Sequence, residues 1–160
     1  MATPAWVPLA TTTLSSSASS VTFGSIPSGF RDLAIVINGT IDSSQDLKFI
    51  FNSDTGSNYS RVAMYGQSSG YGSFADASQT AGNWASVQTV RNTVIANIMD
   101  YSATDKHKTV LVRSDNAGDR TRAYAGRWAS TSAITSIQLD PTSSNWNSGT
   151  TISLWGRNAL

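Results

Sequence analysis

The segment Leu-Ala-Ile-Val-Ile, from Leu33 to Ile37, is apolar at every position and ends at the turn dipeptide Asn38-Gly39. An extended run that is apolar on both faces is typical of a central strand in a sheet covered on both sides. Shorter apolar runs, separated by Gly, Asn, Asp, Ser and Pro, follow through the rest of the chain. They cover residues 20–23, 47–51, 59–65, 108–113, 120–128, 134–139 and 151–155. We expect an all-β fold, a jelly-roll-like sandwich of two sheets with roughly eight to ten short strands.

Two segments need separate interpretation. Val87 to Tyr101 is long and mixed, but Val94, Ala96 and Ile98 alternate along it, and its Val, Ile and Thr content favours a strand over a helix. Residues 66–82 are rich in Gly, Ser and Ala and predict a long exposed loop.

The composition excludes several classes of protein. The chain has 160 residues, only 13% of them charged, a formal net charge of +1 and no Glu, and Ser and Thr are abundant. This argues against a helical bundle and, because no basic run is present to neutralise phosphates, against a nucleic-acid partner. The absence of Cys excludes disulfides and thiolate metal sites. No apolar run approaches the roughly 20 residues that span a bilayer, and no signal peptide is recognisable, so we expect no membrane partner.

The first residues predict an extended arm, residues 1–14, ahead of a single sandwich domain, residues 15–160. Pro4 and Pro8 remove backbone donors, so this arm should lie at a sheet edge or outside the sheet. It also carries Trp6, Val7 and Leu9, and we expect these apolar side chains to lie on a neighbouring subunit. The alternative is that the arm folds back across its own sandwich.

Four segments and the terminal run resemble a known family when taken in this order and spacing. They are SSVTFGSIPSGFRDLAIVI (19–37), LKFIFNSDTGSNYSRVAMYG (47–66), NIMDYSATDKHKT (97–109), GRWASTSAITSIQL (126–139) and GTTISLWGR (149–157). Together they resemble the small virion structural proteins of tailed bacteriophages. The sequence departs from that family at its end, where Trp155 replaces the usual Tyr and residues 157–160 run past the usual stop. The resemblance implies a β-sandwich exposed on the virion, on the capsid or on the tail.

Three motifs that resemble catalytic sequences are better explained as turns. Asp54-Thr55-Gly56 spells the loop of aspartic proteases, but that chemistry needs a second carboxylate and no second copy exists. Residues 66–70 match GxSxG, but a nucleophile elbow must open a helix, and the residues after Ser68 are a poor helix start. His107 is the only His and lies in a polar turn. We therefore expect no catalytic residue, no metal and no cofactor.

Several aromatic residues stand in polar, turn-rich surroundings instead of apolar strands. They are candidates for an interface or for stacking on a ligand, together with Val7 and Leu9 of the arm. The alternative is that they cover the ends of the sandwich. These aromatic residues are Trp6, Tyr71, Phe74, Trp84 and Trp146.

These features predict a non-enzymatic virion protein. The first hypothesis is a capsid decoration, or cement, protein that binds the major capsid protein on the outer capsid surface as a homotrimer and stabilises the head. The alternative is a tail-fibre or receptor-binding protein that contacts other tail proteins and recognises a host-surface glycan.

Overall fold

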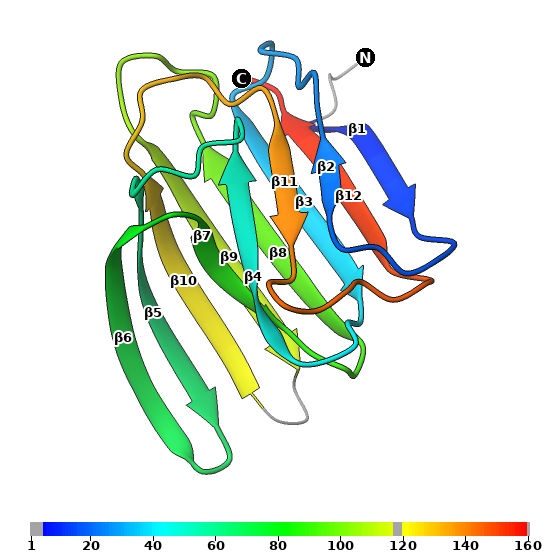
Figure 1. The fold of residues 1–160 in the computed structure, drawn as a ribbon. Coiled ribbons are helices and arrows are strands. Elements are labelled where there is room, and N and C mark those ends of the chain that lie inside the picture. Colours follow the sequence, from blue (N-terminus) through cyan, green and yellow to red (C-terminus); the bar gives the residue numbers. More distant parts are fainter. Residues whose placement is uncertain (1–4, 117–119, 160) are drawn as a thin grey trace.

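The computed structural model describes residues 5–116 and 120–159, and within them the regular elements are twelve antiparallel strands and no helix. No membrane-spanning helix is therefore found in this part of the chain. The strands form two sheets that pack face to face, as Figure 1 shows.

The larger sheet has eight strands and contains the segment 33–37 near its middle. In spatial order its strands are β1 (Trp6–Thr13), β12 (Thr151–Arg157), β3 (Asp32–Gly39), β8 (Asn92–Met99), β9 (Lys108–Asn116), β10 (Arg120–Trp128), β5 (Tyr59–Gln67) and β6 (Gly70–Gln79).

The smaller sheet has four strands and lies across the larger one (Figure 1). In spatial order they are β2 (Val21–Phe23), β11 (Ile137–Asp140), β4 (Gln45–Phe51) and β7 (Gly82–Val87). Its edge strand β7 packs against β10, β9 and β5. The larger sheet continues past β7, so that β6 forms an overhang at one side (Figure 1).

The predicted two-sheet sandwich is confirmed, and the interpretation of residues 87–101 as mainly strand agrees with β8. The structure has twelve strands, more than the eight to ten expected. The long loop predicted for residues 66–82 is wrong: Ser68 and Ser69 form the turn of a hairpin between β5 and β6. Small side chains are compatible with β6 because its backbone pairs along β5, and only alternate residues such as Phe74 need to reach the protein interior.

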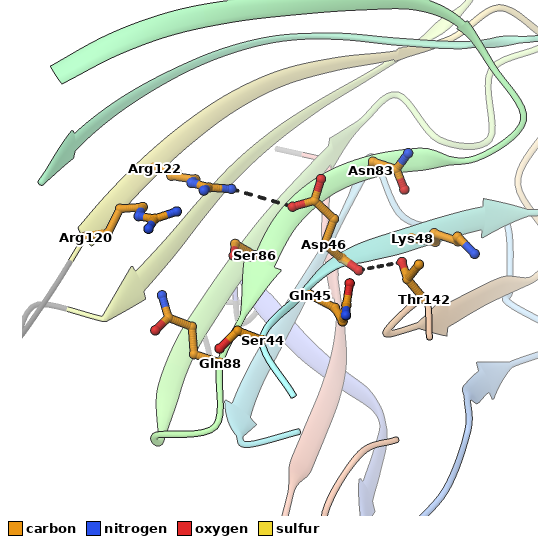
Figure 2. Close-up of a pocket in the computed structure, with 10 residues that line it drawn as sticks. All are labelled: Ser44, Gln45, Asp46, Lys48, Asn83, Ser86, Gln88, Arg120, Arg122 and Thr142. Carbon is orange, nitrogen blue, oxygen red and sulfur yellow. Dashed lines mark hydrogen bonds and ion pairs between the residues drawn. The ribbon is translucent and has the colours of Figure 1, made fainter. Parts of the chain in front are cut away.

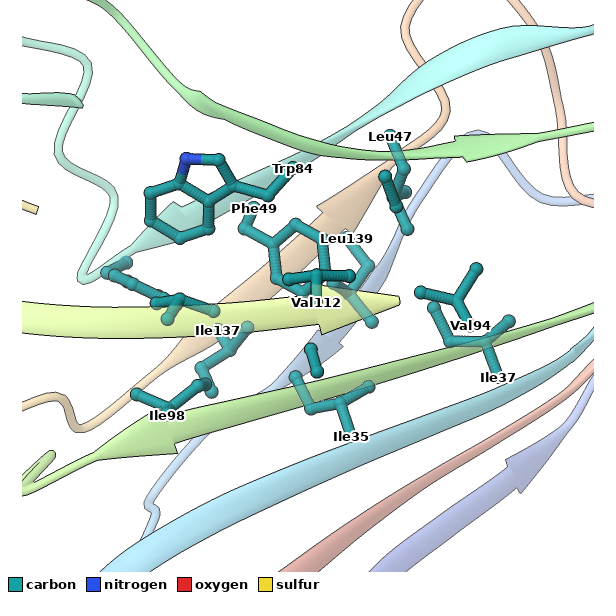
Figure 3. Packing of buried hydrophobic residues seen from close by; sticks show 14 of the residues in the cluster. Ile35, Ile37, Leu47, Phe49, Trp84, Val94, Ile98, Val112, Ile137 and Leu139 are labelled. Atoms are coloured by element: carbon teal, nitrogen blue, oxygen red, sulfur yellow. The ribbon is translucent and has the colours of Figure 1, made fainter. Parts of the chain in front are cut away.

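The core lies between the two sheets, and Figure 3 shows the inward side chains that meet there. Ile35, Ile37 and Val94 from the larger sheet face Leu47 and other apolar residues from the smaller one. All of these are almost completely buried. The alternation that sends every second residue inward therefore accounts for both inner faces.

Trp84 of β7 fixes the distance between the two sheets at the side of the overhang. Its ring is fully buried and lies against Gly82 and Gly126, where an added Cβ atom would overlap it. At Gly82 that atom would be 2.6 Å from three ring atoms of Trp84. The indole Nε1 donates a hydrogen bond to the carbonyl oxygen of Ser60, 3.1 Å away on β5. The absence of side chains at both glycines lets β7 approach β10 closely.

The N-terminal arm lies on its own sandwich in this structure. Residues 6–13 form β1, which pairs with β12 from Trp6 opposite Arg157 to Thr13 opposite Thr151, with an irregularity after Pro8. Leu9 packs partly against the core. Residues 1–4 of the expected arm are outside the described residues.

We predict that Gly126→Ala destabilises the fold by about 1–3 kcal/mol, because the new methyl group overlaps the buried Trp84 ring and overpacks the core. Gly66→Ala is the matched control on the neighbouring strand, since a Cβ atom added there would have no neighbouring atom within 4 Å. It should change the free energy of unfolding by less than about 0.5 kcal/mol. Equilibrium denaturation of both variants measures the difference, and equal stability would contradict the close approach.

Candidate functional site

A polar groove of about 560 Å³ lies beside β7, between the outer face of the smaller sheet and the inner face of the larger one. Figure 2 shows Arg120 and Arg122 entering it from β10, opposite Asp46 of β4. Its volume is within the range of small-molecule sites. The lining residues are Ser44, Gln45, Asp46, Lys48, Asn83, Ser86, Gln88, Arg120, Arg122 and Thr142.

Arg61 of β5 interacts with Asp46 of the groove lining and joins the two sheets. Its Nε donates to Asp76 Oδ2 at 2.7 Å, and its Nη1 donates to Asp46 Oδ2 at 3.1 Å and to the carbonyl oxygen of Asn83. The side chain is only 12% exposed, and its guanidinium lies 4.8 Å from the centroid of the Phe74 ring. Burial lowers the pKa of Arg61, but the hydrogen bonds to Asp76 and Asp46 outweigh it and raise the pKa overall. Arg61 is therefore permanently charged, and its hydrogen bonds connect the two sheets.

Arg122 shares the same carboxylate from the other side. Its Nη1 is 3.5 Å from Asp46 Oδ1 and donates to the hydroxyl of Tyr124 at 3.2 Å. Its side chain is 16% exposed, and its Nε is buried without a hydrogen-bond partner. One carboxylate thus holds two guanidinium groups, and Thr142 Oγ1 donates to the backbone carbonyl of Asp46 at 2.7 Å.

The local sequence of β10 explains why these cations gather. Arg120, Arg122 and Tyr124 alternate along the strand and so point to one face. Further along the strand this face packs under β7, whereas at its start the arginines reach the open groove (Figure 2).

The outer face of the larger sheet carries a second feature, two rows of residues that run across all eight strands and that we call the outer rows. The strand registers align the first row as Ala75, Val62, Ala125, Leu111, Asn97, Ala34, Trp155 and Pro8. They align the second as Ser73, Met64, Ala123, Arg113, Ile95, Val36, Ser153 and Thr11.

The outer rows are mostly apolar although they face away from the core. Val62 is 59% exposed, Met64 65% and Leu111 43%. Shallow apolar hollows lie over them on both sides of Val62 and Met64. Exposed apolar side chains that are contiguous across strands, and not scattered singly, mark interaction surfaces.

The structure separates the predicted contact residues into two groups. Trp84 and Trp146 are completely buried, so they belong to the core and offer no surface to a partner. Trp146 Nε1 donates to the carbonyl oxygen of Leu139. The polar residues next to them in the sequence belong to turns and sheet edges that cover the large indole rings. The prediction that Trp84 and Trp146 are surface contact residues is therefore wrong.

The other predicted residues are at or near the surface, at opposite sides of the larger sheet. Tyr71 is 92% exposed near the tip of the β5–β6 hairpin, while Phe74 is partly buried and packs on Tyr65 and Tyr124. Trp6 is exposed, and Val7 and Leu9 are half-buried, on β1. The structure does not bring these residues together into one site.

Asp54 serves the turn between β4 and β5. Its Oδ2 accepts hydrogen bonds from Trp128 Nε1 at 2.7 Å and Asn58 Nδ2 at 2.9 Å, and its Oδ1 accepts one from the Gly56 amide at 2.8 Å. Burial raises the pKa of Asp54, but these hydrogen bonds outweigh it and lower the pKa below the ordinary 3.8. These three hydrogen bonds to the Asp54 carboxylate stabilise the turn.

Tyr59 supports the same turn. Its hydroxyl donates to the carbonyl oxygen of Asp54 and accepts from the Phe51 amide, both at 3.0 Å. Burial raises its pKa to about 12, so it stays a neutral donor.

The other two residues from motifs that resemble catalytic sequences lie in separate segments of the chain. Ser68 is in the hairpin turn, and His107 is exposed in the segment before β9. Lys108 beside it is completely buried, and its Nζ donates to the carbonyl oxygens of Lys106 and Thr131. Burial lowers the pKa of Lys108. Within residues 5–116 and 120–159, no three potential ligand side chains of His, Asp or Glu are close enough to hold a metal ion.

The sequence did not reveal the groove. The signal that could have indicated it is the alternation of Arg120 and Arg122 within an otherwise apolar strand pattern. The partners Asp46, Arg61 and Asp76 are on other strands, and only the sheet registers bring them together.

Comparisons with known proteins identify no family. No family model and no curated protein matches the chain. Among solved structures, an alginate lyase, Aly36B, in complex with an alginate trisaccharide is 9% identical, with a TM-score of 0.31, over 88% of this chain and 81% of that one. A protein of unknown function from Shewanella oneidensis MR-1 is 11% identical, with a TM-score of 0.22, over 85% and 62%. These similarities are too low to support any inference.

We predict that stability decreases as the pH falls below about 3.8 and that Asp54 contributes to this loss. Because the folded protein lowers the pKa of Asp54, its contribution is complete above the unfolded value and disappears as the pH falls through the folded one. The Asp54→Asn variant should have a lower free energy of unfolding than the parent at pH 7. Its free energy of unfolding should also decrease less than that of the parent as the pH falls. Ser57→Ala, at an exposed and non-titrating position of the same turn, is the control and should follow the parent curve. Parallel pH profiles of parent and Asp54→Asn would contradict the assignment.

Proposed function

We propose that this chain is a non-enzymatic bacteriophage virion structural protein, a capsid decoration protein that attaches as a homotrimer to the major capsid protein on the outer surface of the head. The sequence resemblance supplies the setting, and the observation that carries the proposal is the apolar character of the outer rows. The mechanism is adhesion. The protein bridges neighbouring capsid subunits and so resists their separation.

The outer rows suit attachment because a sheet offers a broad and rigid surface. Val62, Met64 and Leu111 expose apolar area whose burial contributes roughly 25 cal/mol per Å². Small Ala side chains between them let a second protein surface approach the sheet closely.

The charges on this face indicate a complementary partner. Arg113 is in the outer rows and Arg127 is exposed on the same face of β10, whereas the outer rows contain no Asp. An apolar partner surface edged by carboxylates would match them, and two copies packed through these same rows would bring like charges together. The major capsid protein is therefore the partner proposed for this face.

The structural positions of the candidate catalytic side chains support the proposal that the protein is not an enzyme. Asp54 is engaged by three hydrogen bonds in a turn, Ser68 is at a hairpin tip and His107 is in a different segment. A nucleophile needs a base within hydrogen-bond reach, and this set provides none.

The polar groove favours a second candidate function. A tail-fibre or receptor-binding protein would use a groove lined by amides, hydroxyls and cations to recognise a host-surface glycan. Copy number per virion separates the two functions, because a decoration protein is present in hundreds of copies and a tail protein in far fewer.

We predict that Met64→Asp abolishes attachment to particles depleted of this protein without unfolding the chain, because the exposed side chain contributes to adhesion and not to the core. Val90→Asp is the matched control, since Val90 is 52% exposed in the connection between β7 and β8. It should attach like the parent. Co-sedimentation with the depleted particles measures attachment, and circular dichroism checks the fold.

Light scattering on the same samples gives the oligomeric state. A trimer that persists in Met64→Asp while attachment is lost supports separate surfaces for trimerisation and for capsid binding. Undiminished attachment of Met64→Asp would overturn the role of the outer rows.

A further inference from the structure

In the part of the chain that the structure describes, the two sheets end in four edge strands, and three of these are protected against pairing with another chain. β1 contains Pro8, which has no backbone N–H, and its pairing with β12 is irregular after that residue. β2 is only three residues long. β7 packs against β10, β9 and β5. Proline, short length and cover by other elements are usual means of preventing edge-to-edge association.

The fourth edge strand, β6, has none of these protections. It is ten residues long, pairs only with β5 among the described residues, and is the outermost strand of the overhang (Figure 1). Its sequence, GYGSFADASQ, contains no Pro and no Lys. Its one charged side chain, Asp76, interacts with Arg61 of the same chain. The backbone donors and acceptors along one side of β6 are therefore accessible to another strand.

The β5–β6 hairpin decides which backbone groups of β6 point away from β5. Gln67 pairs with Gly70 across a turn of only two residues, so the N–H and C=O groups of these two residues bond to each other. The direction of these groups alternates along a strand. Residues 70, 72, 74 and 76 therefore bond to β5, and residues 71, 73 and 75 direct their backbone groups to the free edge. The register shifts beyond Asp76, so regular pairing covers residues 70–76.

The side chains of residues 70–76 are complementary to those of a second copy of the same segment. If two such strands lie antiparallel with their centres aligned, Tyr71 of one copy is opposite Ala75 of the other. Phe74 is opposite Gly72 in the same way. Each large side chain thus meets a small one, which allows both to pack across the pair of strands.

The backbone and the charges fit the same register. Ser73 is the middle residue of the segment and would lie opposite Ser73 of the second copy, and both direct their backbone groups to the free edge. Asp76 would lie opposite Gly70, so the two carboxylates are at opposite ends of the paired segment. Like charges therefore do not oppose this pairing.

We infer that β6 pairs antiparallel with β6 of a second copy of this chain, with Ser73 at the centre, so that the two larger sheets become one continuous sheet across a two-fold axis. The inference goes beyond the proposed function and does not depend on it. A two-fold contact does not by itself produce a trimer, so in the proposed assembly it would join chains of neighbouring trimers.

The test measures self-association of the full chain in solution. Sedimentation velocity and light scattering at increasing protein concentration give the mass of the assembly, which we expect to double. Hydrogen exchange on the same samples reports the backbone. The amides of Tyr71, Ser73 and Ala75 should exchange more slowly in the associated form, because they then donate hydrogen bonds to the second copy.

Charge substitutions at the centre of the pair test the register. Ser73→Lys and Ser73→Asp each place two like charges opposite one another, and each should abolish the doubling of mass. An equimolar mixture of the two variants should restore it, because Lys then lies opposite Asp. Thr109→Lys adds the same charge at an exposed position on the same face of β9 and should associate like the parent.

Ser73→Pro tests the backbone hydrogen bonds. It removes an N–H group that points away from β5, so the hairpin should remain folded while the doubling of mass is lost. Circular dichroism checks the fold of this variant. If Ser73→Pro does not fold, the two charge variants and their mixture decide the result.

A mass that does not increase with concentration, or Ser73 variants that associate like the parent, would overturn the inference. Failure of the mixed Lys and Asp variants to associate would overturn the register centred on Ser73. Co-sedimentation of the parent and Met64→Asp with depleted particles is scored separately. Self-association and attachment to the capsid can therefore fail independently of each other.

Discussion

The close packing of Trp84 against Gly82 and Gly126 is the constraint on which the arrangement of the two sheets depends. A fully buried indole carries more apolar area than most side chains, and here it also contacts Phe49, Phe51 and Tyr59. It can occupy this position only because β10 has no side chain at residue 126. The edge of the smaller sheet is thereby fixed over β10 and part of β5, and β6 extends beyond it.

The incomplete cover of β5 and β10 explains why charged residues are found on an inner sheet face. Arg61 and Arg122 have the alternation of core residues, but the smaller sheet ends before it covers them completely. Their charges are compensated by Asp46, which reaches over from β4, and by Asp76 from β6. The two guanidinium groups are mostly buried, whereas the two carboxylates are partly exposed to solvent. The groove is thus built by the same ion pairs that close the side of the sandwich.

The two faces of the larger sheet differ in chemistry and support different kinds of interaction. The outer rows are broad and mostly apolar, which favours another protein surface. The groove is concave and lined mainly by polar and charged side chains, which is compatible with a polar ligand. Because the sheet separates them, a protein of this shape can hold one partner through its outer face and leave the groove open to a second.

The sequence by itself determined the two-sheet β-sandwich. The apolar segment 33–37, the alternation of residues 94, 96 and 98, and the regular turn residues are local signals that depend only on side-chain periodicity. It did not determine that the Gly- and Ser-rich residues 70–79 form a strand, because this segment is stabilised by pairing with β5. It also did not determine that Trp84 and Trp146 are buried, because their burial depends on residues distant in the sequence and their sequence neighbours are polar. Only the tertiary structure brought Asp46, Arg61, Asp76 and Arg122 together, because strand order and register, which no local pattern encodes, decide which side chains meet.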